Sequence, residues 1–184
     1  YVKNISQFGV LLALLLSMGA VAQEKDKGTL ALILVKPMPR GAILLAKFAA
    51  LGVTFAISLI AAGLAAYYYT WILFEPLPVV GWLALSALLL LFFVVYVAFT
   101  LLASTLTRSQ AVAGGLGFGF VLFLAALSAI PTVGEYIPLR LLDWGAQLAL
   151  GQAAEPAWRA LAVSVGVIIA SLLASWAIFR RQEL

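Results

Sequence analysis

The sequence predicts an all-α integral membrane protein that forms a single transmembrane domain over residues 1–184 and contains five membrane-spanning helices. The first observation is composition, because 65% of the residues are hydrophobic and only 10% are charged, against roughly 45–50% and 25% in soluble domains. The second is that five stretches carry no charged residue, and each reaches the roughly 20 residues needed to cross a bilayer core. These stretches are residues 4–23, 48–74, 76–107, 109–134 and 160–179.

Helices are favoured over a β-barrel because the apolar residues run continuously instead of alternating with polar ones. A segment in lipid must also satisfy its own backbone hydrogen bonds. The first stretch is interpreted as a span rather than a signal peptide, since it lacks a basic leader and charges follow it instead of a small-residue cleavage site. The expected spans are residues 6–22, 48–74, 79–106, 109–131 and 157–179.

A short helix is expected over residues 24–36, between the first two spans. Glu24 and Asp26 complement the positive end of a helix dipole, and the prolines at 37 and 39 prevent the helix from continuing. Its apolar half is too short to cross a bilayer, so this helix should lie in the interface or pack against protein.

The second span continues an apolar pattern from Gly41 to Phe74, which is about 51 Å of helix and exceeds a bilayer core of about 30 Å. This helix must therefore protrude or tilt. A tight turn, STLTRSQ, then makes the third and fourth spans antiparallel neighbours. The fourth span contains Gly115 and Gly119, whose spacing of four is typical of close helix packing, with a flexible hinge as the alternative.

The segment of residues 132–156 precedes the last span and contains amphipathic sequence after Pro138. A short surface or re-entrant helix fits this pattern, and an ordinary packed loop fits it equally well.

Basic residues gather in alternate connections, which predicts that those connections are cytoplasmic. Lys47, Arg180 and Arg181 are expected to anchor the spans at the lipid interface. This orientation places residues 1–5 outside. Because the chain starts with Tyr1, we expect a sixth span upstream and both ends of the complete subunit inside; five spans with an external amino end are the alternative.

Several kinds of chemistry are excluded by the residues that the chain lacks. With no Cys and no His, it can build neither a disulfide nor a soft-metal site. None of the five uncharged stretches contains an acid, a base or a His of the kind that gradient-driven carriers use, and no nucleophile with a base or Walker loop is present. We therefore expect no enzyme activity and no catalytic, cofactor-binding or metal-binding residue. We attribute the net charge of +4 to membrane topology rather than to nucleic-acid binding.

The segment of residues 24–47 contains, in order, a Glu, a Gly-Thr pair, leucines, Pro-x-x-Arg and a Lys. This series resembles the coupling region of type-two ATP-binding-cassette permeases, the membrane halves of ABC exporters. That family has a Glu, a Gly-Thr pair four residues on, leucines, Pro-x-x-Arg, and a Lys seven residues after the Arg. Pro39 departs from the small polar residue that is common there and would stiffen the turn. The matching residues are Glu24, Gly28, Thr29, Leu30, Leu32, Leu34, Pro37, Arg40 and Lys47.

The resemblance implies a multi-pass permease subunit in a prokaryotic inner membrane, which forms a substrate pathway and pairs with a second permease subunit as a homodimer. A cytoplasmic ATPase subunit would hold ATP and Mg and would contact the segment. The alternatives are a non-transport scaffold or channel that recruits a partner through residues 24–47, and charges that serve topology and lipid headgroups alone. The expected contact residues are Glu24, Lys25, Asp26, Lys27, Gly28, Thr29, Leu30, Leu34, Pro37 and Arg40.

Overall fold

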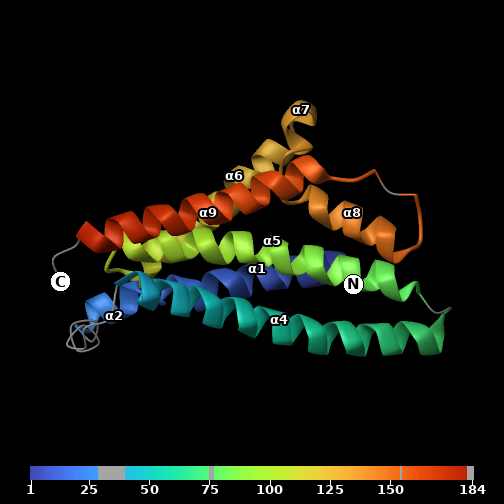
Figure 1. Ribbon diagram of the computed structural model, residues 1–184, viewed down its shortest axis with the longest axis horizontal. Coiled ribbons are helices and arrows are strands. Elements are labelled where there is room, and N and C mark those ends of the chain that lie inside the picture. Colours follow the sequence, from blue (N-terminus) through green and yellow to red (C-terminus); the bar gives the residue numbers. More distant parts are fainter. Residues whose placement is uncertain (29–39, 75–76, 154, 182–184) are drawn as a thin grey trace.

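The computed structural model describes residues 1–28, 40–74, 77–153 and 155–181, and within these ranges the protein is helical with no strand. Figure 1 shows the helices as an elongated bundle. They are α1 (Val2–Met18), α2 (Ala22–Asp26), α4 (Arg40–Leu73), α5 (Val79–Leu106), α6 (Gln110–Ser128), α7 (Pro131–Gly134), α8 (Arg140–Ala149) and α9 (Trp158–Arg181).

Five helical segments are long and apolar enough to cross a membrane, with α1 and α2 taken together as one. The predicted all-α membrane fold is therefore confirmed. The third span coincides with α5, and α4 has the 34 residues that its apolar pattern predicts. The first helix differs, because α1 ends at Met18 although the uncharged stretch continues to residue 23.

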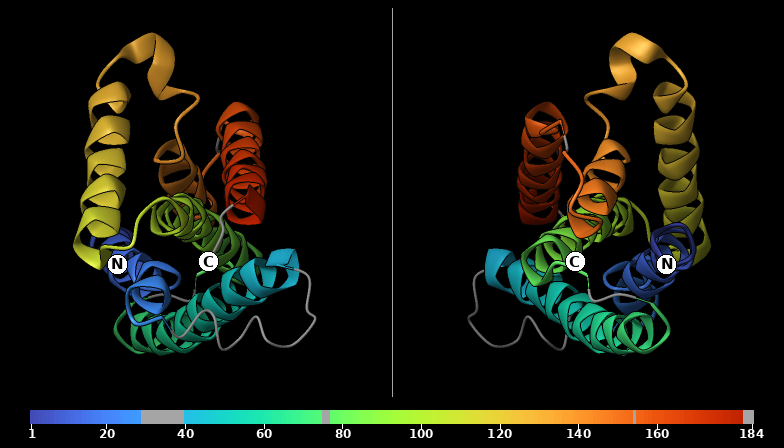
Figure 2. Two further views of the ribbon diagram at one scale, coloured as in Figure 1. Left: turned by 90° about the vertical axis from the view of Figure 1, so that its left-hand side faces the viewer. Right: turned by 90° about the vertical axis from the view of Figure 1, so that its right-hand side faces the viewer.

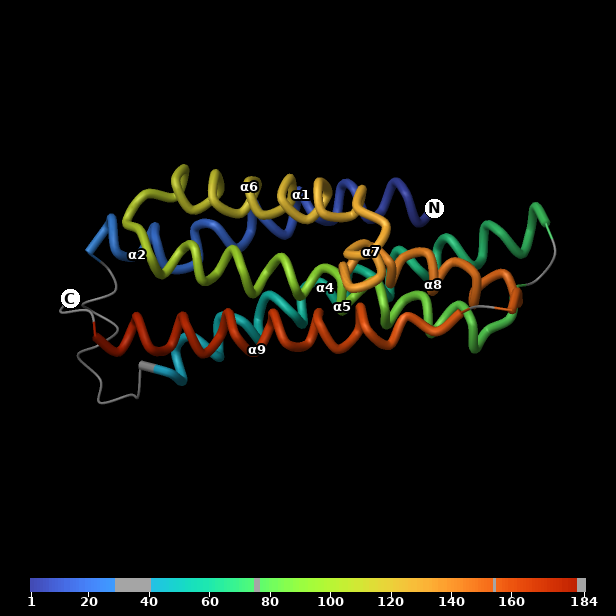
Figure 3. Tube along the Cα trace, turned by 90° about the horizontal axis from the view of Figure 1, so that it is seen from above, coloured from blue at the N-terminus to red at the C-terminus, as the bar shows by residue number. Residues whose placement is uncertain are grey.

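The two ends of the bundle carry different elements. Figures 1 and 3 show α2, the start of α4, the α5–α6 turn and the end of α9 at one end, which we call the α2 end. The α8 helix and the connection from α8 to α9 lie towards the other, which we call the α8 end. Every long helix therefore begins or ends at the α2 end.

The central helix is α5, which contacts α1, α4, α6, α8 and α9. End-on views place it between the pair α1 and α4 on one side and the pair α6 and α9 on the other (Figure 2). Its sequence is apolar all round, as expected of a buried helix.

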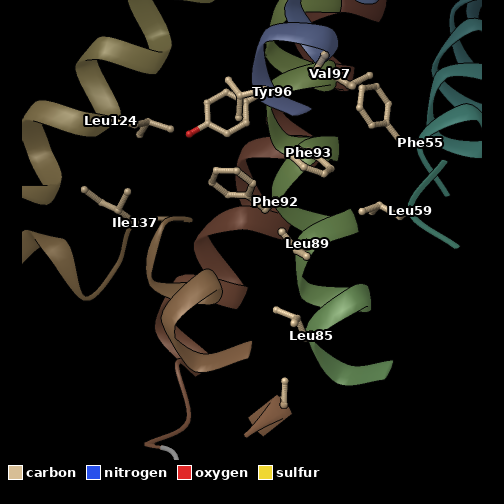
Figure 4. Packing of buried hydrophobic residues seen from close by; sticks show 13 residues of the cluster. Phe55, Leu59, Leu85, Leu89, Phe92, Phe93, Tyr96, Val97, Leu124 and Ile137 are labelled. Carbon is tan, nitrogen blue, oxygen red and sulfur yellow. The ribbon is translucent and has the colours of Figure 1, made fainter. Parts of the chain in front are cut away.

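Aromatic rings of α5 form the middle of the core. Phe93 packs against Phe55 of α4 with ring centroids 5.5 Å apart, while Tyr96 meets Phe92 edge to face at 5.0 Å. Figure 4 shows Tyr96 and Phe92 directed towards Leu124 of α6, opposite to the α4 side. The core cluster comprises Val10, Ala13, Phe55, Leu59, Leu85, Leu89, Phe92, Phe93, Tyr96, Val97, Leu124, Ile137 and Ala149.

Small residues allow α9 to approach α5 closely. Ser164, Ser171 and Ser175 are buried on α9, and small side chains at helix contacts are typical of membrane bundles. The Ser164 hydroxyl donates a hydrogen bond to the Ala160 carbonyl at 2.7 Å, and that of Ser175 donates to the Ser171 carbonyl at 2.7 Å. These hydroxyls therefore satisfy themselves on their own helix and leave the contact to packing.

The glycine contact of α6 involves different residues from those predicted. A Cβ added at Gly115 or Gly119 would meet nothing within 4 Å, whereas one at Gly117 would lie 2.8 Å from Leu14 and from Thr100. At 3.6 residues per turn, positions 115 and 117 point about 200° apart. Within this chain the close contact of α6 is therefore at Gly117, because the glycine run offers two faces and the bundle uses that one. Packing at Gly115 and Gly119 stays a prediction.

The amphipathic segment before the last span contains a helix rather than only a loop. Its helix α8 packs on the first half of α5, and two glycines permit the close approach. A Cβ at Gly81 would lie 1.9 Å from the backbone oxygen of Leu148, and one at Gly145 would lie 2.9 Å from Leu85. Leu141 on the same helix is fully buried.

Candidate functional site

The turn between α1 and α2 is fastened to α5 by one hydroxyl. Ser104 Oγ accepts hydrogen bonds from the backbone nitrogens of Val21 at 3.0 Å and Ala22 at 2.9 Å, and it donates to the Met18 carbonyl at 2.9 Å. A hydroxyl offers one donor and two acceptor sites, so Ser104 uses all three here. Helix ends leave backbone groups unpaired, and this contact satisfies three of them. We call residues 18–25 the α1–α2 corner.

The same corner is fastened to α4 by Lys47. Its Nζ donates to the Ala20 carbonyl at 2.7 Å and forms an ion pair with Glu24 Oε1 at 2.5 Å. The Lys47 and Glu24 side chains are 20% and 28% exposed, so water screens this pair less than a pair on the open surface. The corner is therefore tied to the first part of α4.

A third contact joins α2 to the end of α5. Lys25 Nζ donates to the Thr105 carbonyl at 2.6 Å. The last carbonyls of a helix carry partial negative charge and favour a cation, which explains why a lysine lies there. Two residues of α2 thus contact two different long helices, since Glu24 contacts α4 and Lys25 contacts α5.

An apolar layer lies beside these polar contacts and adds a fourth element. Val21 from the corner packs with Leu44 of α4, Leu101 of α5 and Phe179 of α9. All four side chains are at most 2% exposed. Polar and apolar contacts together therefore join the corner to α4, α5 and α9.

The chain leaves α2 through a glycine turn. The Lys27 amide donates to the Gln23 carbonyl at 3.0 Å, and the Gly28 amide donates to the Lys25 carbonyl at 3.3 Å. Gly28 has a φ of +68°, which is the left-handed conformation that ends helices and that glycine adopts without steric cost. Of the helix predicted over residues 24–36, the structure describes only the beginning, in which α2 ends at Asp26 before this turn; the remainder lies outside the described residues.

The residues predicted to contact a partner divide into two groups. Glu24 and Lys25 are half-buried and turn towards α4 and α5, whereas Asp26, Lys27 and Gly28 are exposed. The other predicted contacts lie outside the described residues; of Arg40 only the backbone is described. They are Thr29, Leu30, Leu34 and Pro37.

Sequence reasoning missed the part that Ser104 plays. The hydroxyl lies at the end of the third span, next to the tight turn, and that position was the available signal. Its hydrogen-bond partners are more than 80 residues away along the chain, so no local pattern contains them.

The charged residues described at the α2 end are mostly basic. Arg180 stacks over Trp176, with its guanidinium carbon 5.3 Å from the ring centroid, and it lies in the last turn of α9 with Arg181. Cations at a helix C-terminus are stabilised by the helix dipole. The acids at this end are Glu24 and Asp26, and the bases are Lys25, Lys27, Lys47, Arg108, Arg180 and Arg181.

Two open hollows lie towards the α8 end, with volumes of about 320 and 430 Å³. Both are lined by Glu135 and Arg140. Arg159 pairs with Glu135 at 3.0 Å, and both side chains are more than 60% exposed, so this pair contributes little to stability. This end has acids and bases in balance rather than a basic excess.

The chain is similar to a known family along nearly its whole length. A family model described as ABC-2 family transporter protein matches residues 3–184. The chain is also 29% identical over 188 residues to the "Uncharacterized transmembrane protein YxlG" of Bacillus subtilis (strain 168), an alignment that covers 99% of this chain and 72% of that protein. The family match includes all five spans and the α1–α2 corner.

Proposed function

Because this chain belongs to the ABC-2 family of transporter proteins, we propose that it is the membrane subunit of an exporter that is driven by a separate ATPase subunit. The α2 end faces the cytoplasm in this proposal, since its described charges are mainly basic and basic connections remain on that side. A second copy of the chain completes the substrate pathway. ATP and Mg are held by the ATPase and not by this chain.

One observation carries the proposal: the α1–α2 corner is fastened to two long helices while the residues that follow it are exposed. Asp26 and Lys27 offer charges to a soluble partner, and Glu24 and Lys25 face the bundle. A partner that moves this segment therefore moves α4 and α5 with it. Such a displacement can shift a transporter between states open to opposite sides of the membrane.

The test is reconstitution with an ABC-type ATPase of the same organism. We expect the ATPase to co-purify with the chain, and its turnover to rise when both are reconstituted into lipid vesicles. Lys27→Glu should weaken both effects, because it reverses an exposed charge beside α2. The matched control is Arg140→Glu, which reverses a charge near the α8 end and should change neither.

Two outcomes oppose the proposal. If the ATPase co-purifies but hydrolyses ATP at the same rate with and without the chain, the chain is a scaffold. If Arg140→Glu weakens association and Lys27→Glu does not, the docking surface lies at the α8 end.

A further inference from the structure

We infer that the ion pair between Glu24 and Lys47 is an internal strut that transmits displacement of α2 directly to α4. Glu24 is then a positioning residue within this chain and not part of the surface that the ATPase touches. This inference rests on the proposed function and names the residues that perform its mechanical step.

The geometry gives α2 a short path to α4. Along the backbone, the two helices are separated by residues 27–39, whereas Lys47 Nζ and Glu24 Oε1 are 2.5 Å apart. Lys47 lies seven residues after the start of α4 at Arg40, which is about 10 Å along the helix axis. A displacement carried by the ion pair therefore enters α4 about two turns beyond its first residue.

Lys47 holds both sides of the corner rather than a single charge. Its Nζ also donates to the Ala20 carbonyl at 2.7 Å, so it bridges the α1–α2 turn and α2 itself. A lysine with two fixed acceptors, one of them a carboxylate, cannot follow α4 without moving the corner or losing both contacts. The strut consequently acts when α2 is pushed and when it is pulled.

The contacts on α5 oppose any independent movement of the corner. Ser104 binds the backbone at Val21 and Ala22, and Lys25 binds the last turn of α5. Since α4 also meets α5 through Phe55 and Phe93 in the core, the two long helices and the corner form a closed set of contacts. Displacement of α2 is therefore shared by α4 and α5.

The partial burial of the pair favours a mechanical role over a role in docking. At 20% and 28% exposure, both charges have lost much of their contact with water, and charges in this setting are costly to separate. A residue that docks a soluble partner must instead offer its charge to solvent, as Asp26 and Lys27 do.

The experiment compares single and double substitutions in the reconstituted complex with the ATPase. Glu24→Gln and Lys47→Met remove one charge each, and the double variant Glu24→Lys with Lys47→Glu exchanges them. We expect each single variant to lower the stimulated ATPase turnover about tenfold while co-purification of the ATPase is unchanged. The exchanged pair should recover most of the loss, because the interaction is restored with opposite sign.

Two kinds of control separate a strut from a loss of folding. Lys47→Arg keeps the charge and should retain the stimulated turnover. Lys3→Met and Asp143→Asn remove one charge each from exposed positions outside the α2 end and should behave as the unmodified chain. A single variant that loses turnover must also show the elution profile of the unmodified complex on size exclusion, and loss of that profile counts against the strut.

Three results would overturn the inference. Full turnover in both single variants would show that the pair carries no displacement. Loss of co-purification in Glu24→Gln would place Glu24 on the docking surface, and failure of the exchanged pair to recover turnover would show that the two side chains act separately. If the unmodified chain neither binds the ATPase nor raises its turnover, the proposed function itself fails, and that result is distinguishable from all three.

Discussion

The hydroxyl oxygen of Ser104 lies 3.0 Å from the backbone nitrogen of Val21 and accepts a hydrogen bond from it. These residues are 83 positions apart in the sequence, one at the end of α5 and the other in the turn after α1. The contact is fully buried, since Ser104 is 0% and Val21 1% exposed. The turn after α1 is therefore bound by a residue of the third span.

Ser104→Ala should destabilise the folded chain in detergent. The substitution leaves the Val21 and Ala22 amides and the Met18 carbonyl without this partner, and one buried unsatisfied group costs about 1–3 kcal/mol. Each kcal/mol lowers the melting temperature by about 2–4 °C in a chain of this size. Thermal unfolding measured by intrinsic fluorescence checks it.

The control for this prediction is Ser86→Ala. Ser86 donates only to the Trp82 carbonyl of its own helix, so its removal should cost much less. Equal melting temperatures for the two variants would show that Ser104 does not hold the corner.

Gly28→Val should destabilise the turn after α2. Gly28 has a φ of +68°, and a residue with a Cβ pays about 1–2 kcal/mol in the left-handed region, more when it is β-branched. Among the residues that the structure describes, nothing lies within 4 Å of the new Cβ, so backbone strain is the expected cause. Thermal unfolding provides the measurement.

Gly52→Ala is the matched control for the glycine turn. Gly52 lies inside α4, where a Cβ would also meet nothing within 4 Å, and alanine in a helix interior is favoured over glycine by about 1 kcal/mol. The two variants should therefore shift the melting temperature in opposite directions. A stabilising effect of Gly28→Val would contradict the glycine turn.

Gly117→Leu should disturb the contact of α6 with α1 and α5. Its Cβ would lie 2.8 Å from side-chain atoms of Leu14 and Thr100, and overpacking of a tight contact costs about 1–3 kcal/mol. Gly115→Leu adds the same side chain on an exposed face of the same helix. The melting temperature in detergent should fall for Gly117→Leu and stay close to the unmodified value for Gly115→Leu. A lower melting temperature for Gly115→Leu than for Gly117→Leu would show that α6 packs through Gly115 instead.

Single cysteines should report the orientation of the two ends. The chain has no cysteine of its own, so each introduced thiol is the sole target for a membrane-impermeant maleimide. In intact right-side-out vesicles we expect Ala153→Cys, which is exposed after α8, to react. Lys27→Cys should react only after the vesicles are permeabilised, and labelling of Lys27→Cys in intact vesicles would reverse the proposed orientation.

The sequence predicts the long helices well because composition controls them. The uncharged run of α5 begins after Pro78 and ends at the polar turn that follows Leu106. The helix occupies the predicted residues. The end of α1 could not be predicted in this way. Its uncharged stretch extends past Met18, and the residue that binds the turn after it, Ser104, lies in the third span.

The contact that Glu24 makes within the chain could not be predicted from the sequence. The position of Glu24 in the family motif predicts a docking contact, whereas its side chain pairs with Lys47 inside the bundle. The direction of a side chain depends on what packs against it, and Lys47 reaches Glu24 because the first part of α4 lies at the same end of the bundle as α2. The spacing of residues along the chain does not show that Lys47 and Glu24 lie close together in the fold.

The helix α5 joins the corner at one end to α8 at the other without a break. Between Ser104, which holds the corner, and Gly81, which admits the backbone of α8, it contains no proline and no further glycine, over about 35 Å of helix. Kinks in helices arise mainly at proline and glycine, so we expect α5 to move as one rigid helix between Gly81 and Ser104. A tilt of α5 at the α2 end is consequently transmitted to the α8 end, where α8 packs on the same helix.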